Sequence, residues 1–127
     1  RLQIAGDVLW PEKEEAIVLA KKAKELGMDV LMEIHNPEEL EIVNEFVDIV
    51  GVNNRNLKTF EVDVETSVNL SKLIHAQFVK ISESGLTGAK EINYLKENGF
   101  KGFLIGETFM KTENPGEACK QLIVELN

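Results

Sequence analysis

Residues 30–39 read Val-Leu-Met-Glu-Ile-His-Asn-Pro-Glu-Glu and contain the start of one βα unit. Four of the first five side chains are apolar, which is typical of a strand covered on both faces. Asn36 then supplies an N-cap, Pro37 suits the first helical position, and an acidic residue follows at the third. This pattern predicts a strand over residues 30–34 and a helix over residues 37–46.

The same unit recurs on both sides of this one. Strands are predicted over residues 2–5, 49–52, 78–81 and 103–105, and helices over residues 11–26, 64–74, 87–98 and 115–126. Pro11 opens the first helix, Gly27 ends it as a left-handed cap, and Thr87 can cap the helix that begins there. Apolar strands that alternate with amphipathic helices predict a parallel sheet with right-handed crossovers. Residues 1–127 are therefore expected to form a single α/β domain.

The composition narrows the classes of function. The formal charge of −8 leaves no basic surface for a polyanion, so nucleic acid is not an expected partner. No apolar run approaches the roughly 20 residues that span a bilayer, and the N-terminus lacks a signal-peptide layout. A soluble cytoplasmic protein without a membrane partner is expected. Cys119 is the only cysteine, which excludes an internal disulfide and a thiolate metal site.

Polar residues follow several strands, at the edge where ligands bind to parallel sheets. Glu33 lies between hydrophobic residues, and it belongs either to a site or to an internal ion pair. Arg55 follows the third strand, and its planar guanidinium suits a carboxylate or phosphate, although pairing with a neighbouring Glu would also explain it. Asn53 and Asn56 beside it could be local backbone caps.

Glycines follow the fourth and fifth strands. Ser82-Glu83-Ser84-Gly85 ends the fourth, and Gly106-Glu107-Thr108 follows the fifth. Glycines at such positions allow backbone N–H groups to approach a phosphate closely, and in barrels this pair of loops is the usual phosphate site. Each glycine alone could equally serve a tight turn.

Taken in order, four motifs resemble the later strand ends of the indole-3-glycerol phosphate synthases: Met32-Glu33-Ile34-His35, Gly51-Val52-Asn53-Asn54-Arg55-Asn56-Leu57, Ser82-Glu83-Ser84-Gly85 and Ile105-Gly106-Glu107-Thr108-Phe109-Met110. The resemblance is close over residues 28–120. It is looser over residues 1–27, where residues 2–5 look like the family's fourth strand. It implies a segment of a (βα)8 TIM barrel that runs from about strand 4 to helix 8.

The family closes the ring of a carboxyphenylamino-deoxyribulose phosphate with loss of carbon dioxide and water, and it uses no metal and no organic cofactor. The implied catalytic residues lie at three consecutive strand ends: Glu33, Asn53, Arg55, Glu83 and Ser84. Among them Glu33 resembles the carboxylate proposed as general base. The implied phosphate site consists of Gly85, Gly106 and the backbone N–H of Glu107.

The chain also departs from the family. The family's catalytic lysines lie on the first and third barrel strands, which have no counterpart here, and a complete barrel takes roughly 250 residues. The isolated chain is therefore expected to be inactive or nearly so. Its sheet is expected to be either a partial barrel or re-packed as a flavodoxin-like open sheet. A homodimer through the exposed sheet face or edge is a further expectation.

Two other functions remain open at this point. One is a non-catalytic half-barrel scaffold, excised or engineered, whose strand-end residues are remnants. The other is a different phosphate-binding barrel such as phosphoribosylanthranilate isomerase, against which the Asn53–Leu57 loop argues. Four residues are expected to have mainly structural roles: His35 as a helix-entry contact, His75 in solvent, Cys119 in the core and Trp10 in packing or an interface. His35 could instead join the site, and Trp10 could stack on an aromatic substrate.

Overall fold

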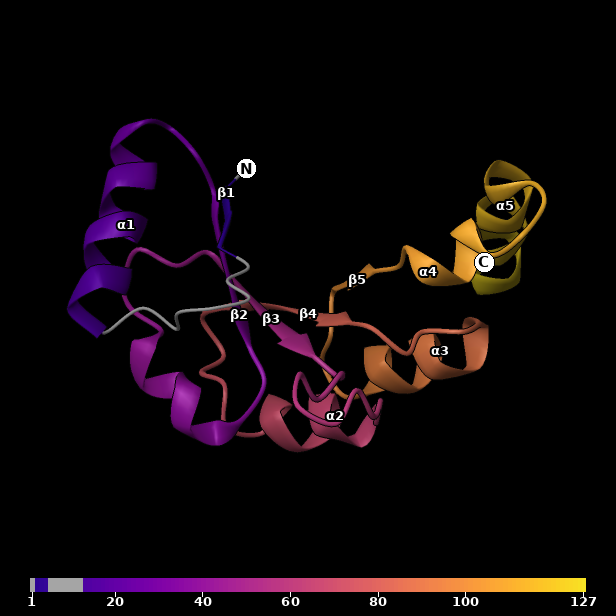
Figure 1. The fold of residues 1–127 in the computed structure, drawn as a ribbon, viewed down its shortest axis with the longest axis horizontal. Helices are drawn as coiled ribbons and strands as arrows, with labels where there is room; N and C mark the ends of the chain where they lie inside the picture. Colours follow the sequence, from indigo (N-terminus) through magenta and orange to yellow (C-terminus); the bar gives the residue numbers. More distant parts are fainter. Residues whose placement is uncertain (1, 5–12) are drawn as a thin grey trace.

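In the computed structural model, which describes residues 2–4 and 13–127, five strands form one parallel sheet (Figure 1). The strands are β1 (Leu2–Ile4), β2 (Val30–Ile34), β3 (Ile49–Asn53), β4 (Val79–Glu83) and β5 (Gly102–Leu104). The helices are α1 (Lys13–Glu25), the 3-10 helix η1 (Pro37–Ile42), α2 (Glu65–Ser71), α3 (Ala89–Glu97), α4 (Glu107–Met110) and α5 (Pro115–Leu126). The predicted roles of Pro11 and Trp10 lie outside the described residues.

The strand order is β1-β2-β3-β4-β5, so each strand pairs with its predecessor in the sequence and all pairs are parallel. A flavodoxin-like sheet would need a reversal of order at one point. None occurs among the described strands, and Figure 1 shows α1, α2 and α3 following one another along one side of the row of strands. The chain therefore forms part of a (βα)8 barrel, and the flavodoxin-like alternative is not what the sheet adopts.

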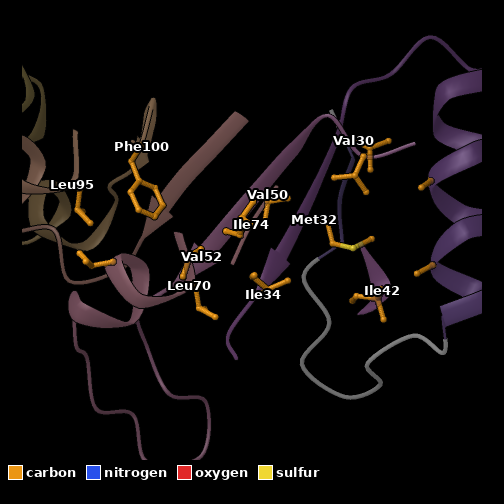
Figure 2. Close-up of a cluster of buried hydrophobic side chains, with 14 of the residues drawn as sticks. Val30, Met32, Ile34, Ile42, Val50, Val52, Leu70, Ile74, Leu95 and Phe100 are labelled. Atoms are coloured by element: carbon orange, nitrogen blue, oxygen red, sulfur yellow. The ribbon is translucent and has the colours of Figure 1, made fainter. Parts of the chain in front are cut away.

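The main hydrophobic core lies between the sheet and its helices. Val30, Met32 and Ile34 of β2 and Val50 and Val52 of β3 point into it, and all are almost completely buried (Figure 2). The helices contribute small or branched side chains that allow close approach, among them Ala16, Ala20, Ala23, Val68 and Leu70. In the part of the chain that the structure describes, no helix has the length and apolar character needed to cross a bilayer.

The alternate strand residues face the other side of the sheet, which corresponds to the inside of a barrel. On this inner face Leu31 and Glu33 of β2 lie beside Gly51 of β3, and Ile81 and Glu83 of β4 follow. All of these side chains are buried, including both carboxyl groups. The inner face of the sheet thus carries two buried carboxyl groups, those of Glu33 and Glu83.

Several predicted boundaries differ from the structure. The helix after β2 ends at Ile42 instead of continuing to Phe46, because Asn44 binds the Ile42 carbonyl and the Phe46 N–H with its own side chain and holds the chain in a turn. Thr87 does not cap α3, since Gly88 occupies the N-cap position without a side-chain hydrogen bond. The short helix α4 was not predicted. Gly27, with φ of 73°, is the left-handed cap that the sequence predicts.

Candidate active site

The residues predicted for the site all lie at the carboxyl-terminal edge of the sheet: Glu33, Asn53, Arg55, Glu83, Ser84, Gly85, Gly106 and Glu107. The parallel arrangement explains this, because the carboxyl ends of such strands meet on one side. They form two groups. One is a buried carboxyl cluster on the inner face of β2, β3 and β4, and the other surrounds a cavity between the loops that follow β3, β4 and β5.

The carboxyl cluster consists of Glu33 and Glu83, with Asn53 and Gly51 between them. Asn53 donates a hydrogen bond of 2.9 Å from Nδ2 to Glu33 Oε1, and it lies opposite Glu83 in the register of β3 and β4. Gly51 provides the space that the Glu83 carboxyl group occupies, since a Cβ at this position would lie 2.2 Å from Glu83 Oε1. A residue without a side chain at position 51 therefore allows the two acids to come together.

The two carboxyl groups have opposite pKa shifts. Burial, reinforced by the neighbouring charge of Glu33, raises the pKa of Glu83 to about 8. Burial also disfavours the charge on Glu33, but hydrogen bonds with His35, Asn53 and Glu83 outweigh it and lower the pKa of Glu33 to about 2. Glu83 Oε1 has no hydrogen-bond donor among the described residues, so no hydrogen bond there stabilises a charged Glu83. The opposite directions of the two shifts favour a single proton on the pair, held by Glu83.

His35 belongs to this cluster, whereas the sequence favoured a contact at the helix entry over a place in the site. That contact exists, since Nδ1 lies 3.3 Å from Glu39 Oε2 of η1, but Nε2 lies 3.2 Å from Glu33 Oε1. Hydrogen bonds with Glu33 and Glu39 raise the pKa of His35 to about 9. The period of two in a strand would have revealed this arrangement, because it places residue 35 on the same face as residue 33.

Arg55 connects the loop after β3 to the loop after β5. Its Nη2 lies 2.7 Å from Glu107 Oε2, and Lys111 Nζ lies 2.6 Å from Glu107 Oε1. The predicted alternative of pairing with a nearby Glu is therefore realised, and the partner is itself a predicted site residue. Lys111 and Arg55 together lower the pKa of Glu107. The group is exposed, so it contributes little to the stability of the fold.

A cavity of about 620 Å³ opens beside this ion pair. It is bounded by the predicted phosphate loops and by three further polar side chains: Ser84, Gly85, Gly106, Glu107, Arg55, Thr108 and Lys111. Gly85 has φ of 72°, and a Cβ there would lie 2.3 Å from Val62 Cγ1, so the fold itself requires glycine. At Gly106 the space for a Cβ is empty, so packing does not explain that glycine.

Arg55 also lines a second cavity, of about 450 Å³, on the side of β2 and β3. This cavity exposes His35, Asn53 and Glu39, and is bounded on its other side by the loop over residues 56–61. The side-chain oxygen Oδ1 of Asn53 accepts a hydrogen bond of 2.9 Å from the backbone N–H of Arg55, and this bond fixes the start of that loop. Arg55 thus stands between the carboxyl cluster and the cavity at the glycines.

Asn54 is a further residue of this region that the sequence did not single out. It is 2% exposed, and its Nδ2 donates to Ser82 Oγ at 2.9 Å and to the Ser84 carbonyl at 3.0 Å. Ser67 of α2 donates from Oγ to Asn54 Oδ1 at 2.8 Å. Ser84 adopts φ of 67°, which is uncommon for a residue with a side chain. The hydrogen bond from Asn54 to the Ser84 carbonyl stabilises this backbone conformation.

Comparison with known proteins agrees with this arrangement. The sequence profile of the family described as "Indole-3-glycerol phosphate synthase" matches residues 8–122. The indole-3-glycerol phosphate synthase of Bacteroides thetaiotaomicron is 46% identical over 112 residues, which cover 88% of this chain and 43% of that protein. That of Magnetococcus marinus is 46% identical over 113 residues, covering 88% of this chain and 42% of the relative. The chain thus spans less than half the length of these relatives.

A solved structure shares the fold at low sequence identity. It is described as the crystal structure of the Amycolatopsis orientalis BexX/CysO complex, and it matches with a TM-score of 0.64 and 16% identity. The match covers 99% of this chain and 54% of the other. At this identity the likeness concerns the fold alone. The profile match over nearly the whole sequence, together with the strand order, establishes that this chain belongs to the indole-3-glycerol phosphate synthase family.

Proposed function

We propose that this chain provides the phosphate-binding and carboxylate part of an indole-3-glycerol phosphate synthase site. The observation that carries the proposal is the common edge at which the buried Glu33–Glu83 pair, Arg55 and the cavity at Gly85 and Gly106 lie. Its substrate would be a phosphorylated anion, as the resemblance implies. The reaction would be ring closure with loss of carbon dioxide and water.

Each group in this proposal has a physical reason. An acidic protein repels an anionic substrate, so it needs directed donors, which Arg55, Lys111 and backbone N–H groups around Gly85 and Gly106 supply. Glu107 pairs with both cations, which leaves the three groups together with a net charge of +1. A bound phosphate would compete with its carboxylate for Arg55. Asn53 would then orient the substrate beside Glu33.

The carboxyl pair supplies the acid–base chemistry in this proposal. Glu83, with its pKa near 8, can give up a proton around neutral pH, whereas Glu33 with its pKa near 2 is a weak base while the pair shares a proton. Glu33 becomes a stronger base once Glu83 has lost its proton. Both acids are therefore proposed to act as one unit, with Glu33 as the ionised member.

Ring-closure assays test the activity. The chain alone is expected to give no measurable turnover, because the lysines of the family's first and third strands have no counterpart in this sequence. Addition of the segment of the Bacteroides thetaiotaomicron relative that this chain does not match should restore turnover if the halves assemble. Turnover by the chain alone at the rate of a complete relative would contradict the expected inactivity.

Phosphate binding is tested separately. Titration of the chain with inorganic phosphate is expected to shift the amide NMR signals of Gly85, Gly106 and Glu107, since these groups border the cavity. The exposed Gly27 at the C-terminal end of α1 serves as a control for general salt effects. Unchanged signals at all three sites would argue against a phosphate site and favour the non-catalytic scaffold.

A further inference from the structure

His35 lies between two carboxylates. Its Nε2 is 3.2 Å from Glu33 Oε1 on β2, and its Nδ1 is 3.3 Å from Glu39 Oε2 on η1. The ring is well shielded, with 14% of the side chain exposed. A neutral imidazole can donate from only one nitrogen, so contact with a carboxylate at each nitrogen favours the imidazolium form.

Glu39 is itself held in place by the start of η1. Asn36 donates from Nδ2 to Glu39 Oε1 at 3.0 Å, and Asn36 Oδ1 accepts a hydrogen bond of 3.0 Å from the Glu39 N–H. The second carboxylate oxygen of Glu39 accepts the backbone N–H of His35. The capping arrangement of η1 therefore fixes the position of His35 as well as the start of the helix.

The charged groups around His35 come from four elements. Glu33 and Glu39 contact the ring, and the Glu83 carboxyl of β4 interacts electrostatically with both Glu33 and His35. The loop after β3 contributes four charged residues to the cavity that His35 lines: Arg55, Lys58, Glu61 and Asp63. The hydrogen bonds with Glu33 and Glu39 are the dominant influences among these groups.

We propose that His35 is a positioning residue whose imidazolium, anchored by Glu39, holds the Glu33 carboxylate and fixes it as the ionised member of the Glu33–Glu83 pair. The proton of the pair then resides on Glu83, whose carboxyl group occupies the space beside Gly51. The importance of this arrangement for ring closure rests on the proposed function. The arrangement itself does not, and it can be measured without turnover.

NMR titration of the histidine side-chain nitrogens in the whole chain tests the first step. The sequence contains two histidines, and the exposed His75 reports on general disturbance of the fold. His35 should remain an imidazolium at pH 8 and titrate near 9, well above the ordinary 6.5. Glu39→Gln should lower this midpoint by about one unit or more. Glu38→Gln removes an exposed charge from the residue next to Glu39, and it should move the His35 midpoint by only about 0.3 of a pH unit.

The Glu33 carboxyl carbon tests the second step. Its titration midpoint should rise in His35→Gln, which keeps an uncharged donor, and rise further in His35→Ala, which keeps none. A side chain that only filled space would leave the Glu33 midpoint nearly unchanged in His35→Gln, which keeps most of the volume, and that result would overturn the proposal. So would a wild-type His35 that titrates near 6.5, a measurement that needs no variant. Failed ring closure after addition of the segment of the relative that this chain does not match, with these midpoints as expected, would count against the proposed function and leave the role of His35 intact.

Discussion

Glu83 and His35 both hold a proton more strongly in the folded chain than their ordinary values allow. An unfolded chain releases the Glu83 proton near pH 4.5, whereas the folded chain keeps it up to about 8. For His35 the corresponding interval runs from 6.5 to about 9. In both intervals the folded state binds more protons than the unfolded state, so stability falls as the pH rises. Glu33 acts at the other end, since its contribution is present above pH 4.5 and is lost as the pH falls towards 2.

We therefore expect the free energy of unfolding to decrease between pH 4.5 and about 9, most steeply between pH 6.5 and 8, where the Glu83 and His35 intervals overlap. Glu83→Gln mimics the protonated carboxyl group and should raise stability at pH 8 by on the order of 1 kcal/mol relative to the unsubstituted chain, with little effect at pH 5. Urea unfolding across this range measures the effect. Exposed Glu45→Gln is the control, and equal profiles for the two variants would show that Glu83 does not carry the shifted proton.

At the scale of elements, α2 is joined to the sheet by polar contacts rather than by apolar packing alone. Ser67 of α2, Ser82 of β4 and Asn54 form a fully buried hydrogen-bonded group. The Ser67 and Ser82 hydroxyl oxygens lie 2.7 Å apart. The same Asn54 receives the Asp63 N–H on its carbonyl and donates its own N–H to the Glu83 carbonyl at 2.8 Å. The position of α2 and the shape of the loop after β4 are thus set together.

Asn54→Ala is expected to destabilise the fold by about 2 kcal/mol or more, because it leaves buried partners such as the Ser84 carbonyl without a donor. It should also weaken any phosphate-induced shift at Gly85 by releasing the loop. Asn69→Ala on the exposed side of α2 should cost less than about 0.5 kcal/mol. Chemical denaturation of the two variants provides the measurement. A loss of similar size in both would mean that the buried network contributes nothing specific.

At the scale of the whole molecule, the sheet is an open arc. β1 and β5 each pair with a single neighbour among the described strands, and the inner face has an exposed apolar side chain at the start of β4. Val79, at the start of β4, is 46% exposed and shares the inner face with Ile81. Open strand edges and exposed apolar surface both favour association.

We expect the chain to self-associate through this face or edge, with a mass that increases with concentration in sedimentation experiments. Val79→Lys should shift the distribution towards the monomer by placing a charge in the contact. Val18→Lys introduces the same charge on the exposed side of α1, where Val18 is 65% exposed, and should have no such effect. A wild-type chain that is monomeric at every concentration would exclude this prediction.

Local patterns in the sequence predicted the five strands and every described helix except α4, because apolar period, caps and turns act over a few residues. The bounds of β2 and the left-handed Gly27 were predicted in this way, whereas the family was inferred from the motifs at the strand ends. Features that depend on contacts between distant segments of the chain were not predicted. The contact of Arg55 with Glu107 and that of Asn54 with Ser82 join residues 52 and 28 positions apart, and only the register of the sheet brings them together. The early end of η1 at Ile42 reflects a competing side-chain hydrogen bond that a helix-start signal does not reveal.

Gly51 has a consequence for how this surface can vary. The Glu83 carboxyl group occupies the volume in which a Cβ at position 51 would lie. A side chain at position 51 and a glutamate in its present conformation at position 83 therefore cannot occur together. A methyl group at 51 is compatible only with a shorter or displaced residue at 83, and the energetic effects of changes at the two positions should not add. The glycine and the acid, which are 32 residues apart in the sequence, should therefore change together when either one changes.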